Sequence, residues 1–346
     1  MGLQSLVIFV VAAVVTILSA LIAFPLLRKA GVVDVPSHRS SHSQVTVRGG
    51  GVAIGCGITV ATILTMVWNV TQHGVFGLGS IMIPIGFLVL TWCYSAIGMS
   101  DDLDSLQPVG RLLGQVILAL VFSSCISLFS TQGIAHVLVF AVIGVTLVNA
   151  VNFVDGLNGY VTTWAIVTGA WFAFVAYWID ESDVSLLALA LAGAAAGFLP
   201  FNLGRAKAFL GDTGSYGIGA AVFAIAVWLF VIGVPIVVII SPMIFILFDV
   251  GLTLVLRLFR GENILLPHRE HTYQRIAQAG WTHAKVSLFH ASLSVLACIM
   301  AVPTLIAGNT ATTYPAHVFW ALLLAVYALL PMWLDRRAAR RQAVLA

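Results

Sequence analysis

The chain has 346 residues, of which 60% are hydrophobic and only 8% are charged, and its mean hydropathy is +1.06. Soluble domains contain about 45–50% apolar residues, so this composition excludes an ordinary soluble protein. The net charge of +3 is small and gives no indication of nucleic-acid binding. The composition predicts an all-α, polytopic integral membrane protein.

Apolar runs of about 20 residues, long enough to cross a bilayer as helices, recur along the whole chain. The first run lacks a basic start and a small-residue cleavage site, so we expect a retained span rather than a signal peptide. No linker, low-complexity tract or internal repeat interrupts the pattern, which predicts one transmembrane domain over 1–346. We expect eleven spans, at about 3–24, 49–70, 80–99, 112–129, 134–151, 159–179, 184–203, 214–232, 234–256, 286–306 and 315–334.

The basic residues occur in alternate loops between these spans. Loops at about 25–48, 100–111, 152–158, 204–213 and 257–285, with the tail 335–346, contain 4, 1, 0, 2, 5 and 4 Lys or Arg residues, which is all 16. Because basic loops are retained in the cytoplasm, the N-terminus is predicted to lie outside and the C-terminus in the cytoplasm. The five loops therefore share the cytoplasmic face.

The second of these loops, "SDDLDSLQPVGR", carries three carboxylates, Asp101, Asp102 and Asp104. A solvated loop would explain one acidic pair as well as a functional site would. The other four loops also bring carboxylates, carboxamides, glycines, His or Arg to this face, which is what a shared anion and metal site needs. They contain the segments "VDVPSHRSSHSQVTVRGGG" (33–51), "NAVNFVDGLNG" (149–159), "FNLGRAKAFLGDTGSYGIG" (201–219) and "PHREHTYQRIAQAGWTH" (267–283).

Two of these polar residues, Asn152 and Asp212, offer the hard oxygen atoms that Mg²⁺ prefers, and Mg²⁺ often takes only one or two protein ligands. Either residue alone would be better explained as a helix cap. Arg111 has a guanidinium that can clamp a phosphate, although an arginine that snorkels to the membrane interface fits its position equally well.

The motifs together are D-x-P-x-x-R-x-x-H, DD, N-x-x-N-F-x-D-G, N-x₉-D-x-G-S and H-R-x-H, in this order between about residues 34 and 283. This arrangement resembles the polyprenyl-phosphate N-acetylhexosamine-1-phosphate transferase superfamily. The resemblance implies transfer of a sugar 1-phosphate from a UDP-N-acetylhexosamine to undecaprenyl phosphate in the bacterial inner membrane, with UMP released. It also implies an active site on the cytoplasmic face.

The resemblance implies roles for individual residues. Asn152 and Asp212 match the ligands of Mg²⁺, for which Mn²⁺ is an alternative. Asp101 and Asp102 match an acidic pair that, with Asp212, is catalytic. The pair acts either as a base or as an organiser of charge, and we favour charge because a phosphate monoester with second pKa near 6 is already ionised. Matches to substrate-binding positions are Arg39, His42, Arg111, Asn149, Asp155, Asn158, Asn202, His268, Arg269 and His271.

The sequence departs from the family pattern in three places. Val45 and Val47 replace two prolines of the first loop, Arg205 replaces a common proline, and Asn158 replaces a common aspartate. The last change leaves the contact with uridine open. The short loops and "RSSH" resemble the branch that starts O-antigen or related surface polysaccharides, whereas the peptidoglycan branch normally has a longer, His-rich fifth loop.

Several alternatives stay open at this level. A lipid-linked sugar transporter or flippase and a peptidoglycan-type phospho-N-acetylmuramoyl-pentapeptide translocase are alternative functions, and a zinc site is an alternative for His268 and His271. The CDP-alcohol phosphotransferase pattern does not follow Asp155. Residues 270–279 could form a short helix on the membrane surface. The sequence leaves the exact sugar and the choice between monomer and homodimer undetermined.

Overall fold

The computed structural model describes residues 2–36, 45–73, 78–104, 106–130, 133–263, 266, 268–307 and 310–345. Within these residues, eleven segments are helical, long and apolar enough to cross a membrane, which confirms the all-α polytopic fold. The orientation stays a prediction. Ten of the spans are the helices α1 (Leu3–Lys29), α2 (Gly51–His73), α3 (Leu78–Leu103), α4 (Pro108–Phe129), α5 (Ile134–Val154), α6 (Tyr160–Trp178), α7 (Ser182–Asn202), α8 (Gly211–Val231), α12 (His283–Ala307) and α13 (Thr310–Leu345).

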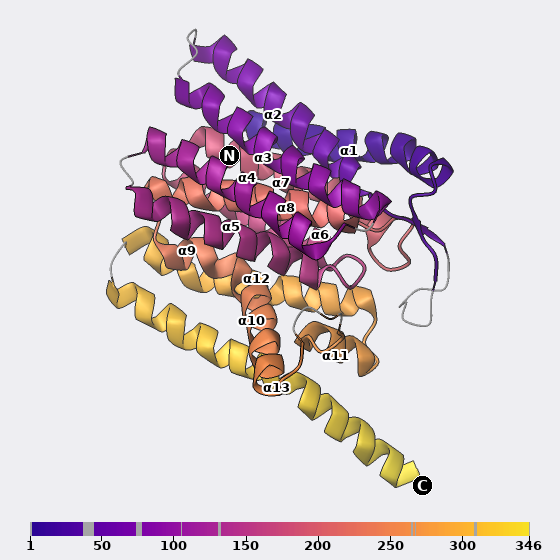
Figure 1. Ribbon diagram of the computed structural model, residues 1–346. Helices are drawn as coiled ribbons and strands as arrows, with labels where there is room; N and C mark the ends of the chain where they lie inside the picture. The colour runs from indigo at the N-terminus through magenta and orange to yellow at the C-terminus, as the bar shows by residue number, and fades with distance from the viewer. Residues whose placement is uncertain are drawn as a thin grey trace.

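Helix α8 lies at the centre of the bundle (Figure 1). Of its most apolar 18 residues 83% are buried, against 17% for α4 and α13, which lie at the periphery. Helix α3 packs along α8, and α1 and α6 both pack along α7. The sequence "LALALAGAAAG" of α7 explains this arrangement, because small side chains let neighbouring backbones approach closely in the absence of a hydrophobic driving force between helices in lipid.

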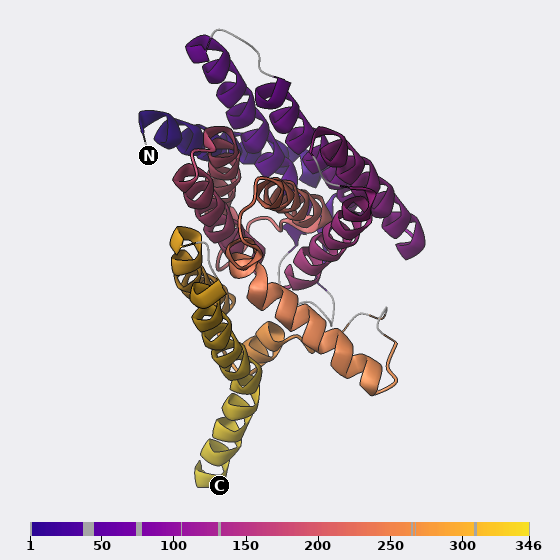
Figure 2. The same cartoon turned by 90° about the vertical axis from the view of Figure 1, so that its left-hand side faces the viewer.

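The ninth span is broken rather than continuous. It consists of α9 (Ile236–Ile240), a 3₁₀ turn η1 (Ser241–Met243) and α10 (Ile244–Phe259). Pro242 lies in the turn, where its ring and its missing N–H interrupt the helical hydrogen bonding. Beyond the break, α10 leaves the bundle obliquely (Figure 2). Its outer face is apolar, and Phe259 at its end is 86% exposed.

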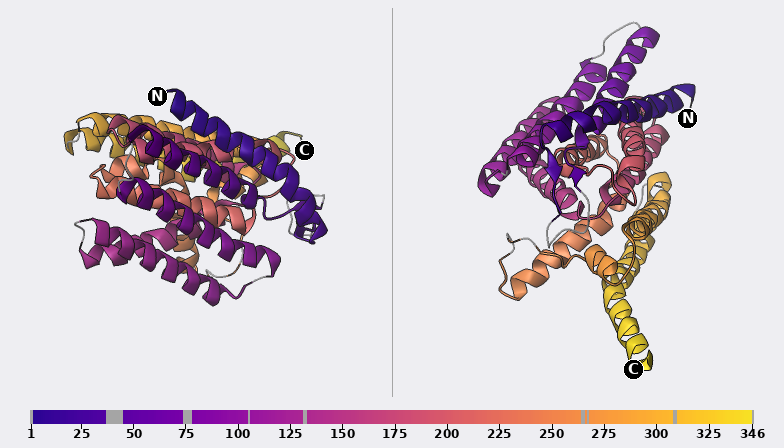
Figure 3. Two further views of the ribbon diagram at one scale, coloured as in Figure 1. Left: turned by 90° about the horizontal axis from the view of Figure 1, so that it is seen from above. Right: turned by 90° about the vertical axis from the view of Figure 1, so that its right-hand side faces the viewer.

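The short elements lie at one end of the bundle, on the right in Figure 1 and facing the viewer in the right panel of Figure 3. Strands β1 (Val33–Asp34) and β2 (Thr46–Val47) pair antiparallel, with Val33 opposite Val47 and Asp34 opposite Thr46. Helix α11 (Thr272–Gln278) and the segments that precede α6 and α8 lie at the same end. Polar segments far apart in the sequence therefore meet here.

The helices extend further than the expected spans, so several site candidates lie on helix ends rather than in loops. Asp101 and Asp102 belong to the last turn of α3, and Arg111 to the first turn of α4. Asn152 is in the last turn of α5 and Asp212 in the first turn of α8. Helical backbone holds these side chains more rigidly than a loop would.

Candidate active site

The base of the site is formed where the "RGGG" segment meets the start of α8. The N–H groups of Gly50 and Gly51 donate hydrogen bonds of 3.0 Å to the carbonyl oxygens of Phe209 and Leu210. A Cβ atom on Gly51 would lie 2.1 Å from Cα of Gly214, so only glycine permits this approach. The first and fourth loops are thus held together by backbone contacts.

Asp102 is held entirely by protein groups at the N-terminus of α8. Its carboxylate accepts hydrogen bonds from the N–H of Asp212 (3.1 Å), the N–H of Thr213 (2.9 Å) and the hydroxyl of Thr213 (2.7 Å). It also pairs with Nε of Arg48 at 3.0 Å, and its side chain is 0% exposed. Negative charge at a helix N-terminus is stabilising. Asp102 therefore orients Asp212 and is not open to a substrate.

Asp101, the neighbour of Asp102, is directed toward the start of α4. It accepts a hydrogen bond of 2.6 Å from Nη1 of Arg111 and one of 2.8 Å from the N–H of Leu106. The same Nη1 lies 3.8 Å from Oδ2 of Asp212. Arg111 therefore bridges two carboxylates, and its positive charge is fixed beside Asp212.

Asn152 and Asp212 form the pair that fits a divalent cation. Nδ2 of Asn152 donates to Oδ1 of Asp212 at 2.9 Å and to the hydroxyl of Ser215 at 3.0 Å, so the amide is oriented and its oxygen is left as an acceptor. In the described part of the chain there is no group of three or more His, Cys, Asp or Glu residues that could hold a metal by themselves. Two oxygen ligands of this kind suit Mg²⁺, which takes its other ligands from water and phosphate.

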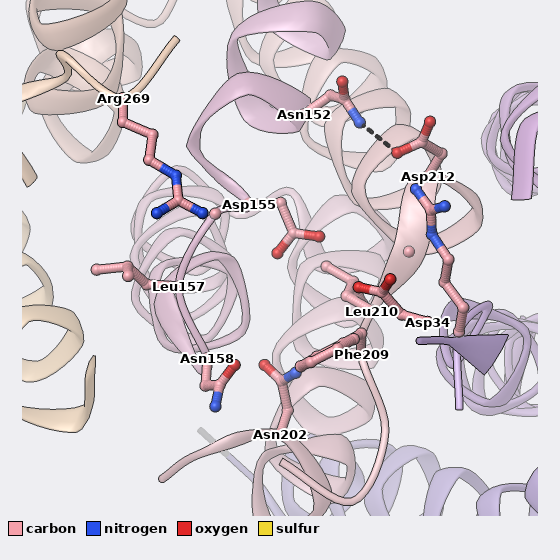
Figure 4. Close-up of a pocket in the computed structure, with 13 residues that line it drawn as sticks. Asp34, Asn152, Asp155, Leu157, Asn158, Asn202, Phe209, Leu210, Asp212 and Arg269 are labelled. Carbon is pink, nitrogen blue, oxygen red and sulfur yellow. Dashed lines mark hydrogen bonds between the residues drawn. The ribbon is translucent and has the colours of Figure 1, made fainter. Parts of the chain in front are cut away.

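These residues open onto a pocket of about 340 Å³. In Figure 4, Asn152 and Asp212 lie on one wall, Arg269 points in from the opposite side, and Asp155 lies between them. Three acidic side chains and two guanidiniums line the pocket, so a cation bound there would offset the repulsion between ionised carboxylates and a diphosphate. The lining residues are Asp34, Arg48, Asn152, Asp155, Gly156, Leu157, Asn158, Asn202, Phe209, Leu210, Gly211, Asp212 and Arg269.

Asp155 is a pocket carboxylate whose pKa is raised. Its removal from water, reinforced by the negative charges of Asp212 and Asp102, raises its pKa well above the usual value, and Arg48 opposes this only in part. A cation bound at the pocket would favour its ionised form.

The carboxamides build the side of the pocket. Oδ1 of Asn202 accepts hydrogen bonds from the N–H of Gly159 (2.8 Å) and the hydroxyl of Thr162 (2.9 Å). Nδ2 of Asn158 donates to the carbonyl of Gly204 at 2.7 Å. The structure thus brings Asn158 and Asn202 together, whereas Asn149 turns toward α4 and donates to Oε1 of Gln115 at 2.6 Å.

The histidines of the fifth loop lie beside the pocket rather than in it. His271 is 3% exposed and its Nδ1 lies 3.7 Å from Oδ1 of Asp249. The ring centroids of His268 and His271 are 4.9 Å apart, and burial lowers the pKa of His268. The short helix expected at 270–279 is present as α11, but Tyr273 and Ile276 pack inside the protein.

Two predicted residues, Arg39 and His42, lie outside the described residues. Sequence reasoning had also given no role to Asp34, Arg48 or Phe209, which line the pocket. Arg48 belongs to the "RGGG" segment, and Phe209 lies three residues before Asp212, so their nearness to recognised motifs was the available signal.

Comparison with known proteins agrees with the family resemblance of the loop motifs. A model of glycosyl transferase family 4 matches residues 84–230, which include the second, third and fourth loops. The chain is 26% identical over 298 residues to a probable undecaprenyl-phosphate N-acetylglucosaminyl 1-phosphate transferase of Bacillus subtilis, covering 79% of this chain and 78% of that protein.

Two further relatives belong to different branches. A decaprenyl-phosphate N-acetylglucosaminephosphotransferase of Mycobacterium leprae is 26% identical over 320 residues (80% of this chain, 78% of the relative). A phospho-N-acetylmuramoyl-pentapeptide-transferase of Moorella thermoacetica is 28% identical over 319 residues (83% and 94%). These matches support the resemblance of the chain to the polyprenyl-phosphate N-acetylhexosamine-1-phosphate transferase superfamily.

Proposed function

We propose that this chain transfers an N-acetylhexosamine 1-phosphate from a UDP-sugar to undecaprenyl phosphate in the bacterial inner membrane. The products are undecaprenyl-diphosphate-sugar and UMP. The observation that carries the proposal is the Asn152–Asp212 pair, which faces Arg269 across a pocket at the end of a membrane-embedded bundle. The relatives act, by their names, on undecaprenyl or decaprenyl phosphate, which supports the proposal.

The proposed reaction is an in-line displacement at phosphorus. An oxygen of the lipid phosphate forms a bond to the β-phosphorus of the UDP-sugar, and the bond from that phosphorus to the α–β bridging oxygen breaks. The electron pair leaves with UMP, while the bond between sugar C1 and its oxygen stays intact. The lipid phosphate is largely ionised near pH 7, so no protein base has to remove a proton first.

The residues of this chain contribute position and charge. Arg269 and Arg111 would stabilise the negative charge that builds up on the diphosphate, a contribution that usually dominates catalysis of this kind. Asp101 fixes Arg111, and Asp102 fixes the backbone that carries Asp212. Asn152 and Asp212 would hold Mg²⁺, or Mn²⁺ in its place, and the ion would supply charge neutralisation and orientation of the phosphates.

A reconstitution experiment tests the proposal. Purified protein is incubated with Mg²⁺, undecaprenyl phosphate and UDP-N-acetylglucosamine labelled in the sugar, and both products are measured. We expect UMP and lipid-soluble label in equal amounts, and loss of both when a chelator removes the metal. The alternative of a transporter or flippase predicts neither product, and vesicle uptake of a lipid-linked sugar would then support it.

The proposed place in metabolism is the first membrane step of O-antigen or related surface polysaccharide synthesis. A pocket that hydrogen-bonds an acetamido group should reject plain UDP-glucose, because polar groups left unpaired on binding are costly. The relatives include both the N-acetylglucosamine and the pentapeptide branch at similar identity, so turnover of UDP-N-acetylmuramoyl-pentapeptide would shift the assignment to the peptidoglycan step.

A further inference from the structure

A buried aspartate in α10 has no part in the reaction as proposed above. Asp249 lies inside the broken ninth span and is 0% exposed. Its carboxylate accepts hydrogen bonds from the N–H of Thr272 (2.7 Å), the N–H of Tyr273 (3.2 Å) and the hydroxyl of Tyr327 (2.9 Å). An ionisable residue within a span is costly and usually indicates function, so its partners call for an explanation.

Asp249 shares one face of α10 with Arg257, a second residue that binds the fifth loop. Thr253 and Arg257 follow at intervals of four residues and are also buried, at 5% and 6% exposure. Arg257 donates to Oε1 of Glu270 and to the carbonyl of Asn263, each at 2.9 Å. Asp249 and Arg257 are thus about 12 Å apart along α10, and both bind the fifth loop.

These tethers bind the residues that directly follow Arg269. Glu270 is bound by Arg257, and the first turn of α11 is bound by Asp249. Arg269 lies between this tethered segment and the pocket, which its side chain enters from the wall opposite Asp212. Within the described part of the chain its guanidinium forms no ion pair, so it is available to an anionic ligand.

The first turn of α11 also contacts the third loop. Tyr273, whose N–H is bonded to Asp249, donates from its hydroxyl to the carbonyl of Phe153 at 3.0 Å. Phe153 is the neighbour of Asn152. The hydroxyl of Tyr273 would lie only 2.5 Å from a Cβ atom on Gly156, so the two surfaces are in close contact. One carboxylate is therefore connected to both walls of the pocket.

We propose that Asp249 is a positioning residue, which holds the segment 268–273 on α10 and so fixes the Arg269 guanidinium over the pocket. Its negative charge is required, because all of its bonded partners are donors. An asparagine of the same shape would turn an NH₂ group toward an N–H or O–H donor and lose those bonds. The kinetic part of this inference rests on the proposed function.

The first test measures position without activity. Amide hydrogen exchange of the peptide 268–278 is compared in purified wild-type protein, Asp249→Asn and the matched control Tyr327→Phe, which removes a donor to the same carboxylate from α13. We expect exchange about tenfold faster or more in Asp249→Asn, which corresponds to about 1.4 kcal/mol, and little change in Tyr327→Phe. Unchanged exchange in Asp249→Asn would overturn the proposal.

The second test measures coupling to Arg269. We expect Asp249→Asn to raise KM for the UDP-sugar about tenfold, to leave KM for undecaprenyl phosphate unchanged, and to have no further effect in an Arg269→Ala background. A merely structural role would lower activity by the same factor in both backgrounds and would refute the proposal. If Asp249→Asn does not fold, Thr272→Pro removes the N–H that donates to Asp249 at the first position of α11, where proline is tolerated. It is expected to change exchange and KM in the same direction, and unchanged exchange would overturn the proposal.

The two tests separate the two proposals. If wild-type protein shows no transferase activity with the substrates above, the proposed function fails, and amide exchange alone decides the positioning proposal. If transferase activity is present and the exchange of 268–278 is unchanged in Asp249→Asn, only the positioning proposal fails.

Discussion

The aspartates Asp101, Asp102 and Asp212 lie in one site but have different surroundings. We therefore expect them to have different roles. Asp102 is buried and fully bonded, Asp101 pairs with Arg111, and Asp212 presents its carboxylate to the pocket beside Asn152. The DD motif treats the first two as a pair. Only the structure separates them, because their side chains point to different helices.

Asp212 is expected to be essential for catalysis. Asp212→Asn removes the charge that would hold the cation, and Asn152→Ala removes the second ligand, so each should lower the rate by at least ~10²-fold. Both variants should remain in the membrane. Turnover by purified protein is the measurement, and a near-normal rate for Asp212→Asn would exclude the metal assignment.

Replacement of Asp101 and Asp102 by asparagine is expected to have different effects, on kcat for Asp101 and on stability for Asp102. Asp102→Asn should lower the free energy of unfolding by about 1–3 kcal/mol, seen as a lower unfolding temperature, because α8 loses a charged cap and Arg48 loses its partner. Asp101→Asn should lower kcat with a smaller effect on stability. Raising the pH to 9 should not rescue Asp101→Asn, and full recovery there would support a role as a base instead.

Asp155 gives a pH dependence of stability whose sign follows from its raised pKa. Its folded pKa lies above the unfolded value, so its contribution is fully present below the unfolded pKa and is lost as the pH rises through the folded pKa. In chelator, wild-type protein should therefore lose stability from acidic toward alkaline pH more steeply than Asp155→Asn. Thermal unfolding against pH measures this, and parallel curves for the two proteins would contradict it.

At the scale of elements, the contact between the "RGGG" segment and α8 depends on glycine. A Cβ atom at Gly51 would meet the backbone of Gly214 at 2.1 Å, so Gly51→Ala should destabilise the protein by about 1–3 kcal/mol or more. Gly110 in α4 is the matched control, because a Cβ atom there would meet nothing within 4 Å. Thermal unfolding of both variants in detergent is the measurement, with equal stability as the contrary result.

The helices themselves were largely predictable, and their ends were not. Eleven spans follow from apolar length alone. The break in the ninth span was marked by Pro242, but its consequence, an oblique α10, depends on packing. Asp249 was overlooked although an isolated charge in an apolar run is a signal, and Arg257 was counted only as a basic residue of the fifth loop, because the partners of both lie in other segments.

At the scale of the whole molecule, the polar segments meet at one end, in agreement with the alternation of basic loops that predicts a cytoplasmic site. We expect a phosphatase fused after Glu181, in the loop before α7, to be active outside the cytoplasm. A fusion after Gly156 should be inactive. The opposite pattern would reverse the orientation and place the pocket away from cytosolic UDP-sugars.

The same arrangement implies an order of assembly during synthesis. Asp102 finds two of its partners, Asp212 and Thr213, only after more than 100 further residues have been made. Its other partner, Arg48, is already present when α3 enters the membrane. The Arg48 ion pair would therefore shield the Asp102 charge in the nascent bundle, until α8 arrives and the same carboxylate becomes the cap that aligns Asp212.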